Sequence, residues 1–227
     1  MLRAPQPYHS WVGTAGGSIM AVGIVISLGG GPAIMVLAAI SAAVVAGAAA
    51  ALGRAGFPTF FVQVISAAIP SGLALGVAWL QSQGMARWID TPSLVVVSGI
   101  IVLLAGMTVV GAAQDALDGY YVTASARGLE VVVITMGIAV GIGSVLIVSD
   151  LAGLPMTISA QVTAFIGVGY SALAALLAGV GFSLSARASP KTVLVAAIVT
   201  PAVYLAYQPI MLLELPVGFA VAGPAIL

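Results

Sequence analysis

Long apolar stretches alternate with short polar breaks along the chain. Each stretch is close to the roughly 20 residues that a helix needs to cross about 30 Å of hydrocarbon. Charged residues fall between the stretches or at their edges. The pattern predicts about seven transmembrane helices, over residues 12–29, 32–52, 59–81, 93–113, 129–149, 160–185 and 191–213.

The composition strengthens this prediction. Hydrophobic residues make up 62% of the chain and the mean hydropathy is +1.24, which leaves too little polar sequence to cover a soluble surface. No loop is long enough to fold as a soluble domain. We therefore expect an all-α, polytopic helical membrane protein in which residues 1–227 form a single membrane domain. A multi-pass protein of this kind would lie in the plasma (inner) membrane, surrounded by lipid.

The basic residues predict the orientation of the chain. If the N-terminus is cytoplasmic, five of the six basic residues lie inside and Arg87 lies outside. The positive-inside rule favours this arrangement clearly over its reverse. The basic residues expected inside are Arg3, Arg54, Arg127, Arg187 and Lys191.

Several functional classes lose support from what the sequence lacks. There is no cysteine, so thiolate metal sites and disulfides are excluded. The single histidine, His9, has no acidic neighbour that would make it a metal ligand or a base, so we expect no metal, cofactor or catalytic residue. An enzyme is the least favoured class, because no set of catalytic residues is evident. A channel is poorly supported, because the sequence lacks a loop that resembles a selectivity filter. Zero net charge without a basic patch gives no reason to expect nucleic acid.

Small residues recur at four-residue spacing in three of the predicted helices. Membrane helices approach each other closely over such residues, so we expect these stripes to serve packing. The stripes are Ala39, Ala43, Gly47 and Ala51; Gly167, Ser171, Ala175 and Gly179; and Gly137 with Gly141.

Two prolines lie inside predicted helices. Pro70 and Pro201 each remove one backbone hydrogen bond, freeing the carbonyl groups of Ser66 and Ala197. Broken helices in corresponding places of two halves can mark a transport site. An ordinary kink satisfied by neighbouring helices is an equal alternative.

Residues 105–130 differ from the rest because an apolar helix runs there into an acidic, polar turn. Asp115 and Asp118 are three residues apart, which would place both on one helical face at the cytoplasmic end, with Arg127 able to pair with them. The pair could take up protons or attract an ammonium group. Alternatively, it is a solvated helix end that fixes the loop. The candidates for a substrate or proton path are Thr108, Gln114, Asp115, Asp118 and Arg127, with Gln63 and Gln161 as further neutral groups.

This segment resembles the threonine/serine exporter family, whose membrane domain carries P-G-x-x-L-x-N-A-x-x-D-x-x-x-G-D-Y followed by Ala-Arg-x-x-Glu. Ala105, Gly111 and Tyr120 stand where the family has proline, asparagine and an acidic residue, and Gln114 stands where arginine is common. The glycines at 29–31 and the segment 57–63 also fit. The matching residues are Gly106, Ala112, Asp115, Gly119, Tyr121, Ala126, Arg127 and Glu130.

The resemblance implies a secondary transporter that exports threonine, serine or similar small amino acids, driven by the proton gradient. It also implies that residues 12–149 form a first helical half of five spans, and that 160–227 begin an incomplete second half. Family members have further spans and a cytoplasmic N-terminal domain. The chain would then be an exporter, a fragment of one, or a non-transporting or half-transporter subunit that needs a partner chain or a homo-oligomer.

Overall fold

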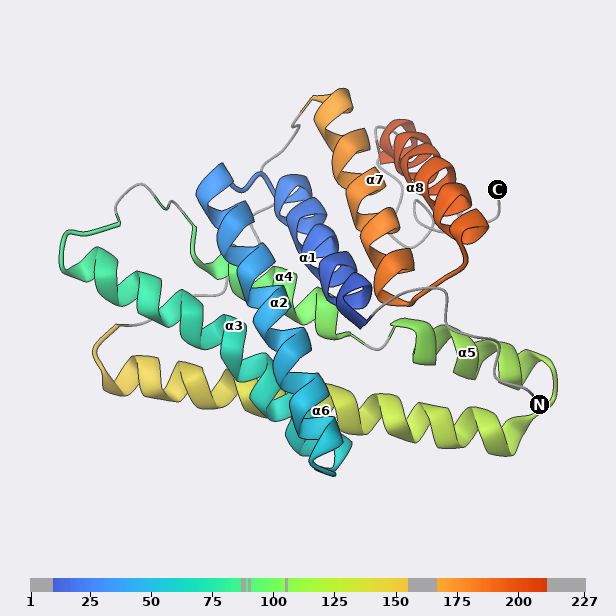
Figure 1. Ribbon diagram of the computed structural model, residues 1–227, viewed down its shortest axis with the longest axis horizontal. Helices are drawn as coiled ribbons and strands as arrows, with labels where there is room; N and C mark the ends of the chain where they lie inside the picture. Colours follow the sequence, from blue (N-terminus) through green and yellow to red (C-terminus); the bar gives the residue numbers. More distant parts are fainter. Residues whose placement is uncertain (1–9, 87–88, 90, 105, 155–166, 212–227) are drawn as a thin grey trace.

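The computed structural model describes residues 10–86, 89, 91–104, 106–154 and 167–211. This part of the chain consists of helices joined by short connections, without a strand (Figure 1). The helices are α1 (Ser10–Ser27), α2 (Pro32–Arg54), α3 (Thr59–Ser82), α4 (Ser93–Leu103), α5 (Gly106–Leu117), α6 (Tyr121–Leu151), α7 (Val168–Ser185) and α8 (Pro190–Met211).

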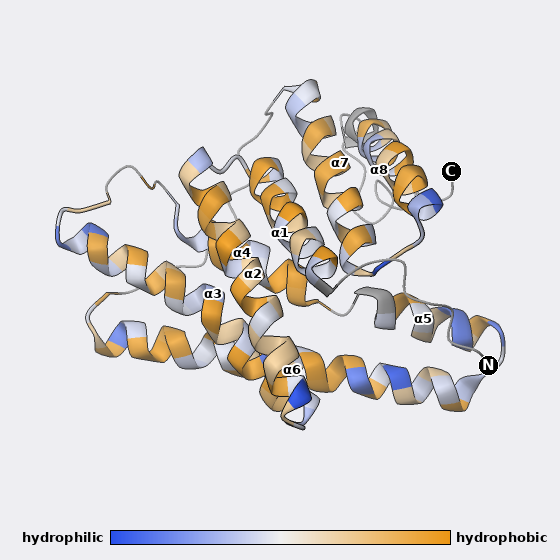
Figure 2. Cartoon of the chain, in the orientation of Figure 1, coloured by the Kyte–Doolittle hydropathy of each residue, from blue (hydrophilic) through white to orange (hydrophobic). Residues whose placement is uncertain are grey.

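Six segments of the described chain are long and apolar enough to cross a membrane. They are α2, α3, α4 together with α5, α6, α7 and α8, while the apolar part of α1, Trp11–Ser27, is slightly shorter. Figure 2 shows hydrophobic residues along the middle of these helices and hydrophilic ones mainly at their ends. The predicted class, an all-α polytopic membrane protein, is confirmed.

Two helix boundaries differ from the prediction. The expected helix over 93–113 is divided in two, because the backbone turns extended at Leu104, where ψ is 133°. The expected break over 114–128 is largely helical, since α6 already begins at Tyr121. With 31 residues, α6 is about 46 Å long. It therefore exceeds the roughly 30 Å of hydrocarbon.

Most helices end in the same way. A glycine with φ between 70° and 84° follows α1, α2, α3, α5 and α6. After α1, for example, the Gly30 amide donates to the Val25 carbonyl at 2.9 Å and the Gly29 amide to that of Ile26 at 3.0 Å, which is a Schellman motif. Helix α7 ends in the same motif, but Arg187, with φ of 53°, takes the place of the glycine.

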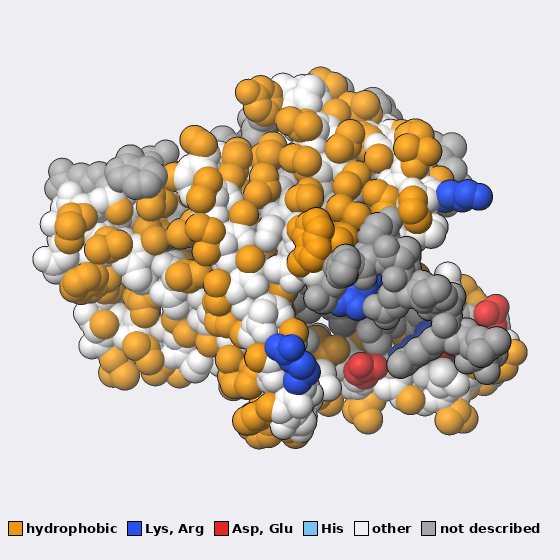
Figure 3. All heavy atoms as spheres, viewed as in Figure 1, with side chains coloured by type: hydrophobic (Ala, Val, Ile, Leu, Met, Phe, Trp, Pro, Cys, Tyr) orange, Lys and Arg blue, Asp and Glu red, His pale blue; other side chains and the backbone are white. Residues whose placement is uncertain are grey.

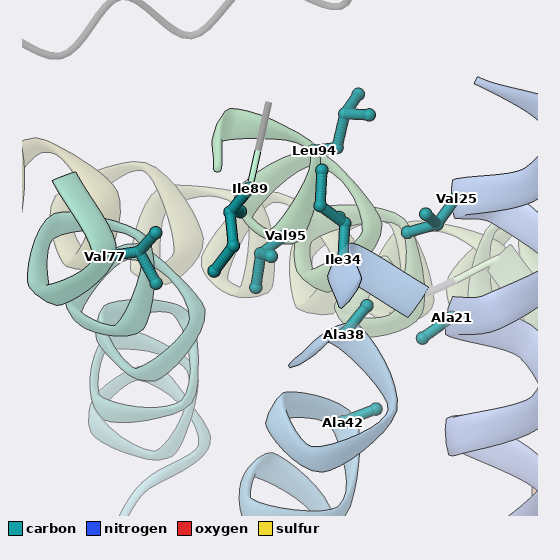
Figure 4. Packing of buried hydrophobic residues seen from close by; sticks show 9 residues of the cluster. All are labelled: Ala21, Val25, Ile34, Ala38, Ala42, Val77, Ile89, Leu94 and Val95. Carbon is teal, nitrogen blue, oxygen red and sulfur yellow. The ribbon is translucent and has the colours of Figure 1, made fainter. Parts of the chain in front are cut away.

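Helix α4 lies between the other helices, in contact with α1, α2 and α3. Buried apolar residues of these four helices, with Ile89, form the largest core cluster (Figure 4). On one side of this core α1 packs along α7, and α7 in turn packs against α8. On the other side α3 packs along α6. The cluster consists of Ala21, Val25, Ile34, Ala38, Ala42, Val77, Ile89, Leu94 and Val95.

Glycines allow the closest helix contacts. A Cβ atom at Gly137 would lie 2.8 Å from the Phe60 carbonyl oxygen, and one at Gly141 would collide with the backbone of Val64, so α6 packs directly on α3. The packing role predicted for these two glycines is confirmed. Gly47 behaves differently, because a Cβ atom there would meet nothing within 4 Å. The packing role predicted for Gly47 is therefore wrong.

The predicted breaks at Pro70 and Pro201 are not breaks, since α3 and α8 continue through both prolines. Pro70 is buried and packs on α4, where a Cβ atom at Gly99 would lie 2.7 Å from its ring. Helix α4 therefore packs directly against the Pro70 ring. The interruption that the structure does contain lies at Leu104, between α4 and α5.

Candidate functional site

The segment singled out in the sequence forms a helical hairpin. Helix α5 ends at Leu117, a turn reverses the chain at Gly119, where φ is 84°, and α6 returns along α5 (Figure 1). The Tyr120 amide closes the turn by donating to the Asp115 carbonyl at 2.8 Å. Large apolar side chains at the tip are mostly exposed, including that of Leu117.

An ion pair joins the two helices of this hairpin. Arg127 Nη1 on α6 lies 3.2 Å from Asp115 Oδ2 on α5. The contact lacks hydrogen-bond geometry, so this buried oxygen accepts no hydrogen bond from the described residues. Gly111 makes room for the guanidinium, because a Cβ atom there would lie 2.5 Å from Nη1. The predicted pairing of Arg127 with Asp115 is therefore present.

The other predicted residues do not gather around this pair. Asp118 follows the end of α5 and is exposed, so the two carboxylates do not share a helical face. Gln114 is exposed as well, and Thr108 is half-buried on α5. Gln161 lies outside the described residues. The structure thus connects two of the five candidates and separates the rest.

Helix α3 carries two polar atoms that the sequence analysis did not bring together. Gln63 Oε1 and Ser66 Oγ are buried and have no hydrogen-bond partner among the described residues. They lie on one face of α3, three residues apart. For Ser66, the sequence pointed only to the carbonyl group that Pro70 leaves free. The spacing of the two polar side chains was the available signal.

A cavity of about 500 Å³ opens between α1, α2, α4 and α7. Its walls are mainly small and apolar residues, and two arginines, Arg54 and Arg187, line it at the ends of α2 and α7. Val102 and Leu103 close one side, so the cavity borders the interruption after α4. The space-filling view shows basic side chains beside a hollow below α1 and α7 (Figure 3). The remaining lining residues are Trp11, Gly13, Thr14, Gly17, Ala42, Val45, Ala46, Gly47, Ala49, Ala50 and Ser185.

This cavity was not predicted from the sequence. The two arginines were expected only to mark the orientation of the chain, and Gly47 to serve helix packing. The lining comes from four helices that are distant in the sequence, and no local pattern connects them. Within the described ranges, no group of His, Cys, Asp or Glu side chains could hold a metal ion.

Comparison with known proteins identifies what the chain resembles. Residues 1–149 match the family model described as "Putative threonine/serine exporter". A "Probable threonine/serine exporter" of Mycobacterium tuberculosis is 39% identical over 142 residues, which are 63% of this chain and 26% of the relative. A "Threonine/serine exporter" of Corynebacterium glutamicum is 37% identical over 144 residues, 62% of this chain and 28% of the relative.

The chain therefore spans about a quarter of the length of these curated relatives. The matched residues include α1 to α5 and nearly all of α6, with the hairpin that carries Asp115 and Arg127. Helices α7 and α8 follow the matched residues. No solved structure matches the chain significantly.

Proposed function

The chain belongs to the threonine/serine exporter family, and on that premise we propose that it exports small amino acids, such as threonine and serine, from the cytoplasm across the plasma membrane. The observation that carries this proposal is the family match over residues 1–149, a region built of apolar, membrane-crossing helices. Export and its substrates are proposed for this chain by similarity to relatives that are described as threonine/serine exporters.

The interrupted helix supports a transport role. Helix α4 has 11 residues and is about 16 Å long, roughly half of the hydrocarbon thickness. Irregular backbone at membrane depth is tolerated where it is buried in protein or lines a cavity. Carriers often place substrate and ion sites at such discontinuous helices. Here the end of α4 borders the cavity between α1, α2, α4 and α7.

For the driving force we propose the proton gradient, with Asp115 as the carboxylate that takes up the proton. Its side chain is 20% exposed and its ionic partner belongs to the neighbouring helix. Protonation of Asp115 would remove the ion pair that joins α5 to α6. The alternative is structural, in that the ion pair only fixes the hairpin.

Efflux of preloaded, labelled threonine and serine from cells that express the chain tests this proposal. We expect faster efflux than from empty cells, and we expect an uncoupler to abolish the difference. If Asp115 carries the proton, the Asp115→Asn variant should lose uncoupler-sensitive efflux, whereas Arg127→Gln, which breaks the same ion pair, should retain it. Equal loss in both variants would indicate a structural ion pair. Efflux equal to that of empty cells, with the protein present in the membrane, would contradict export by this chain.

A second candidate function is that of a membrane subunit that needs a partner, either another half-transporter or a second copy. One observation favours it: none of the apolar window of α8 is buried within the described part of the chain, so its surface is open to another chain. Co-purification of a second membrane protein, and export only when both are present, would establish this function. Export by the chain alone would exclude it.

A further inference from the structure

We propose that the cavity between α1, α2, α4 and α7 binds the exported amino acid, with Arg54 and Arg187 holding its α-carboxylate. The identity of the ligand rests on the proposed function. The cavity, its charges and the position of Arg187 are independent of that function. Neither arginine belongs to the hairpin segment by which the sequence resembles the family.

The charges of the cavity suit an anion. Arg54 and Arg187 line it, and none of the described residues that form its lining is acidic. Guanidinium groups bind carboxylates through paired, charge-assisted hydrogen bonds. Arg54 Nε donates to the Ala50 carbonyl at 3.2 Å, and its other four N–H groups have no partner among the described residues. Arg187 reaches toward α1, where its Nε lies 3.6 Å from the Cβ position of Gly13.

The backbone conformation of Arg187 is a separate indication. Five other helices of the described chain end in a glycine at the equivalent position, where φ is positive. An arginine with φ of 53° is strained there, because the left-handed region brings Cβ close to the following carbonyl oxygen. Glycine would satisfy the same turn without this strain. The geometry of the turn therefore does not explain an arginine at position 187, whose side chain lines the cavity.

The end of α4 supplies the complementary charge. Val102 and Leu103, the last residues of α4, line the cavity, and the chain leaves helical geometry at Leu104. The last carbonyl groups of a helix lack helical partners and form the negative end of its dipole. This end would face the ammonium group of an amino acid whose carboxylate lies on the arginines. Both charges of a zwitterion would then be matched in one cavity.

The size and shape of the cavity also fit a small molecule. Its volume of about 500 Å³ lies within the ≈ 300–1,000 Å³ typical of ligand sites. Glycine and alanine residues of α1 and α2, which lack large side chains, leave this space open. Gly47 lines the cavity, and a Cβ atom there would meet no protein atom within 4 Å. A larger side chain at this position is therefore a suitable probe of the cavity.

Binding of labelled threonine to the purified full chain, in nanodiscs of zwitterionic lipid, tests the site. We expect saturable binding that Arg54→Gln and Arg187→Gln each weaken at least tenfold. Threonine amide, which keeps the ammonium group and lacks the carboxylate, should not compete. Arg187→Gly should weaken binding equally while the melting temperature stays the same or rises, because the backbone strain is relieved.

Filling the cavity gives a second test with a matched control. Gly47→Leu should abolish threonine binding by occupying the cavity. Gly76→Leu on α3 is the control, because Gly76 is also a helical glycine with nothing within 4 Å of its Cβ position and lies outside the cavity lining. Loss of binding in both variants, or in neither, would overturn the assignment.

Further outcomes separate the possible ligands and the two proposals. Absence of threonine binding to the wild-type chain, or unchanged binding in the arginine variants, would overturn the site. If anionic lipid stays with the purified wild-type chain but not with these variants, and displaces threonine, then the arginines bind lipid phosphate and the carboxylate assignment is wrong. Threonine efflux that persists in the arginine variants would reject the site and leave the proposed export intact. Arginine-dependent binding without efflux would support the site and reject export by this chain.

Discussion

Gly111 and Arg127 show how a single missing side chain positions a charge. Since a Cβ atom at Gly111 would lie 2.5 Å from Arg127 Nη1, the guanidinium occupies the space that another residue would fill. From there it reaches Asp115 on the same helix as Gly111. The glycine, which stands where the family pattern has asparagine, therefore determines how α5 is held against α6.

We predict that Gly111→Ala disturbs this ion pair. The matched control is Gly128→Ala, since Gly128 lies next to Arg127 and has nothing within 4 Å of its Cβ position. Replacing a helical glycine by alanine stabilises by up to about 1 kcal/mol, so Gly128→Ala should raise the thermal stability. The increase in thermal stability should be smaller for Gly111→Ala, because Arg127 must move away from Asp115.

A double-mutant cycle measures the difference. In an Arg127→Gln background, Gly111→Ala should recover the full gain of the control, with a coupling of roughly 0.5–1 kcal/mol, as expected for a partly exposed ion pair. Equal gains for both glycine substitutions in the native background would show that Arg127 does not depend on the space at Gly111.

At the scale of helices, the contact of α6 with α3 depends on backbone proximity. Gly137 and Gly141 face the backbone of Phe60 and Val64 so closely that no side chain fits between the helices. Lipid does not drive apolar faces together, so this contact depends on close van der Waals packing.

We predict that Gly137→Ala destabilises the protein by about 1–3 kcal/mol, the usual cost of overpacking. The backbone of α3 would have to shift, because the nearest atom is the Phe60 carbonyl oxygen. Gly143→Ala on the same helix, with nothing within 4 Å, should leave the stability unchanged or raise it. Thermal unfolding in detergent compares the two variants, and similar melting temperatures would contradict the close contact.

The helices were predictable from the sequence where hydropathy and turn residues agree. Glycines at 29–31 followed by Pro32 mark the turn between α1 and α2, and the structure has Pro32 at the first position of α2. The division of α4 from α5 carried no such signal, because apolar residues continue through Leu104 and Ala105 stands where the family has proline. The start of α6 was missed because residues 121–128 are too polar to read as a span, although they form helix.

At the scale of the whole molecule, the apolar outer surfaces and the polar ends follow from the membrane. Large hydrophobic side chains on α6 and α8 are exposed, among them Ile147 and Ile198, as expected for surfaces that face lipid or a partner. Arg54 and Arg187 line one cavity and therefore lie at the same end of the molecule. This agrees with the orientation that the positive-inside rule predicts.

We predict that positions 54 and 127 face the cytoplasm and position 87 faces outside. The chain has no cysteine, so single cysteines at these positions report accessibility without background. An impermeant thiol reagent added to intact cells should label position 87 and leave positions 54 and 127 unlabelled until the cells are opened. Labelling of position 54 but not 87 from outside would reverse the orientation, and the arginine cavity would then open away from the substrate.

Threonine efflux from proteoliposomes that contain only this chain tests the central claim most directly. Preloaded threonine should leave faster than from protein-free liposomes, faster still when the outer solution is acidified, and Arg187→Gln should slow it. A rate equal to that of protein-free liposomes, at either outer pH, would contradict export by this chain.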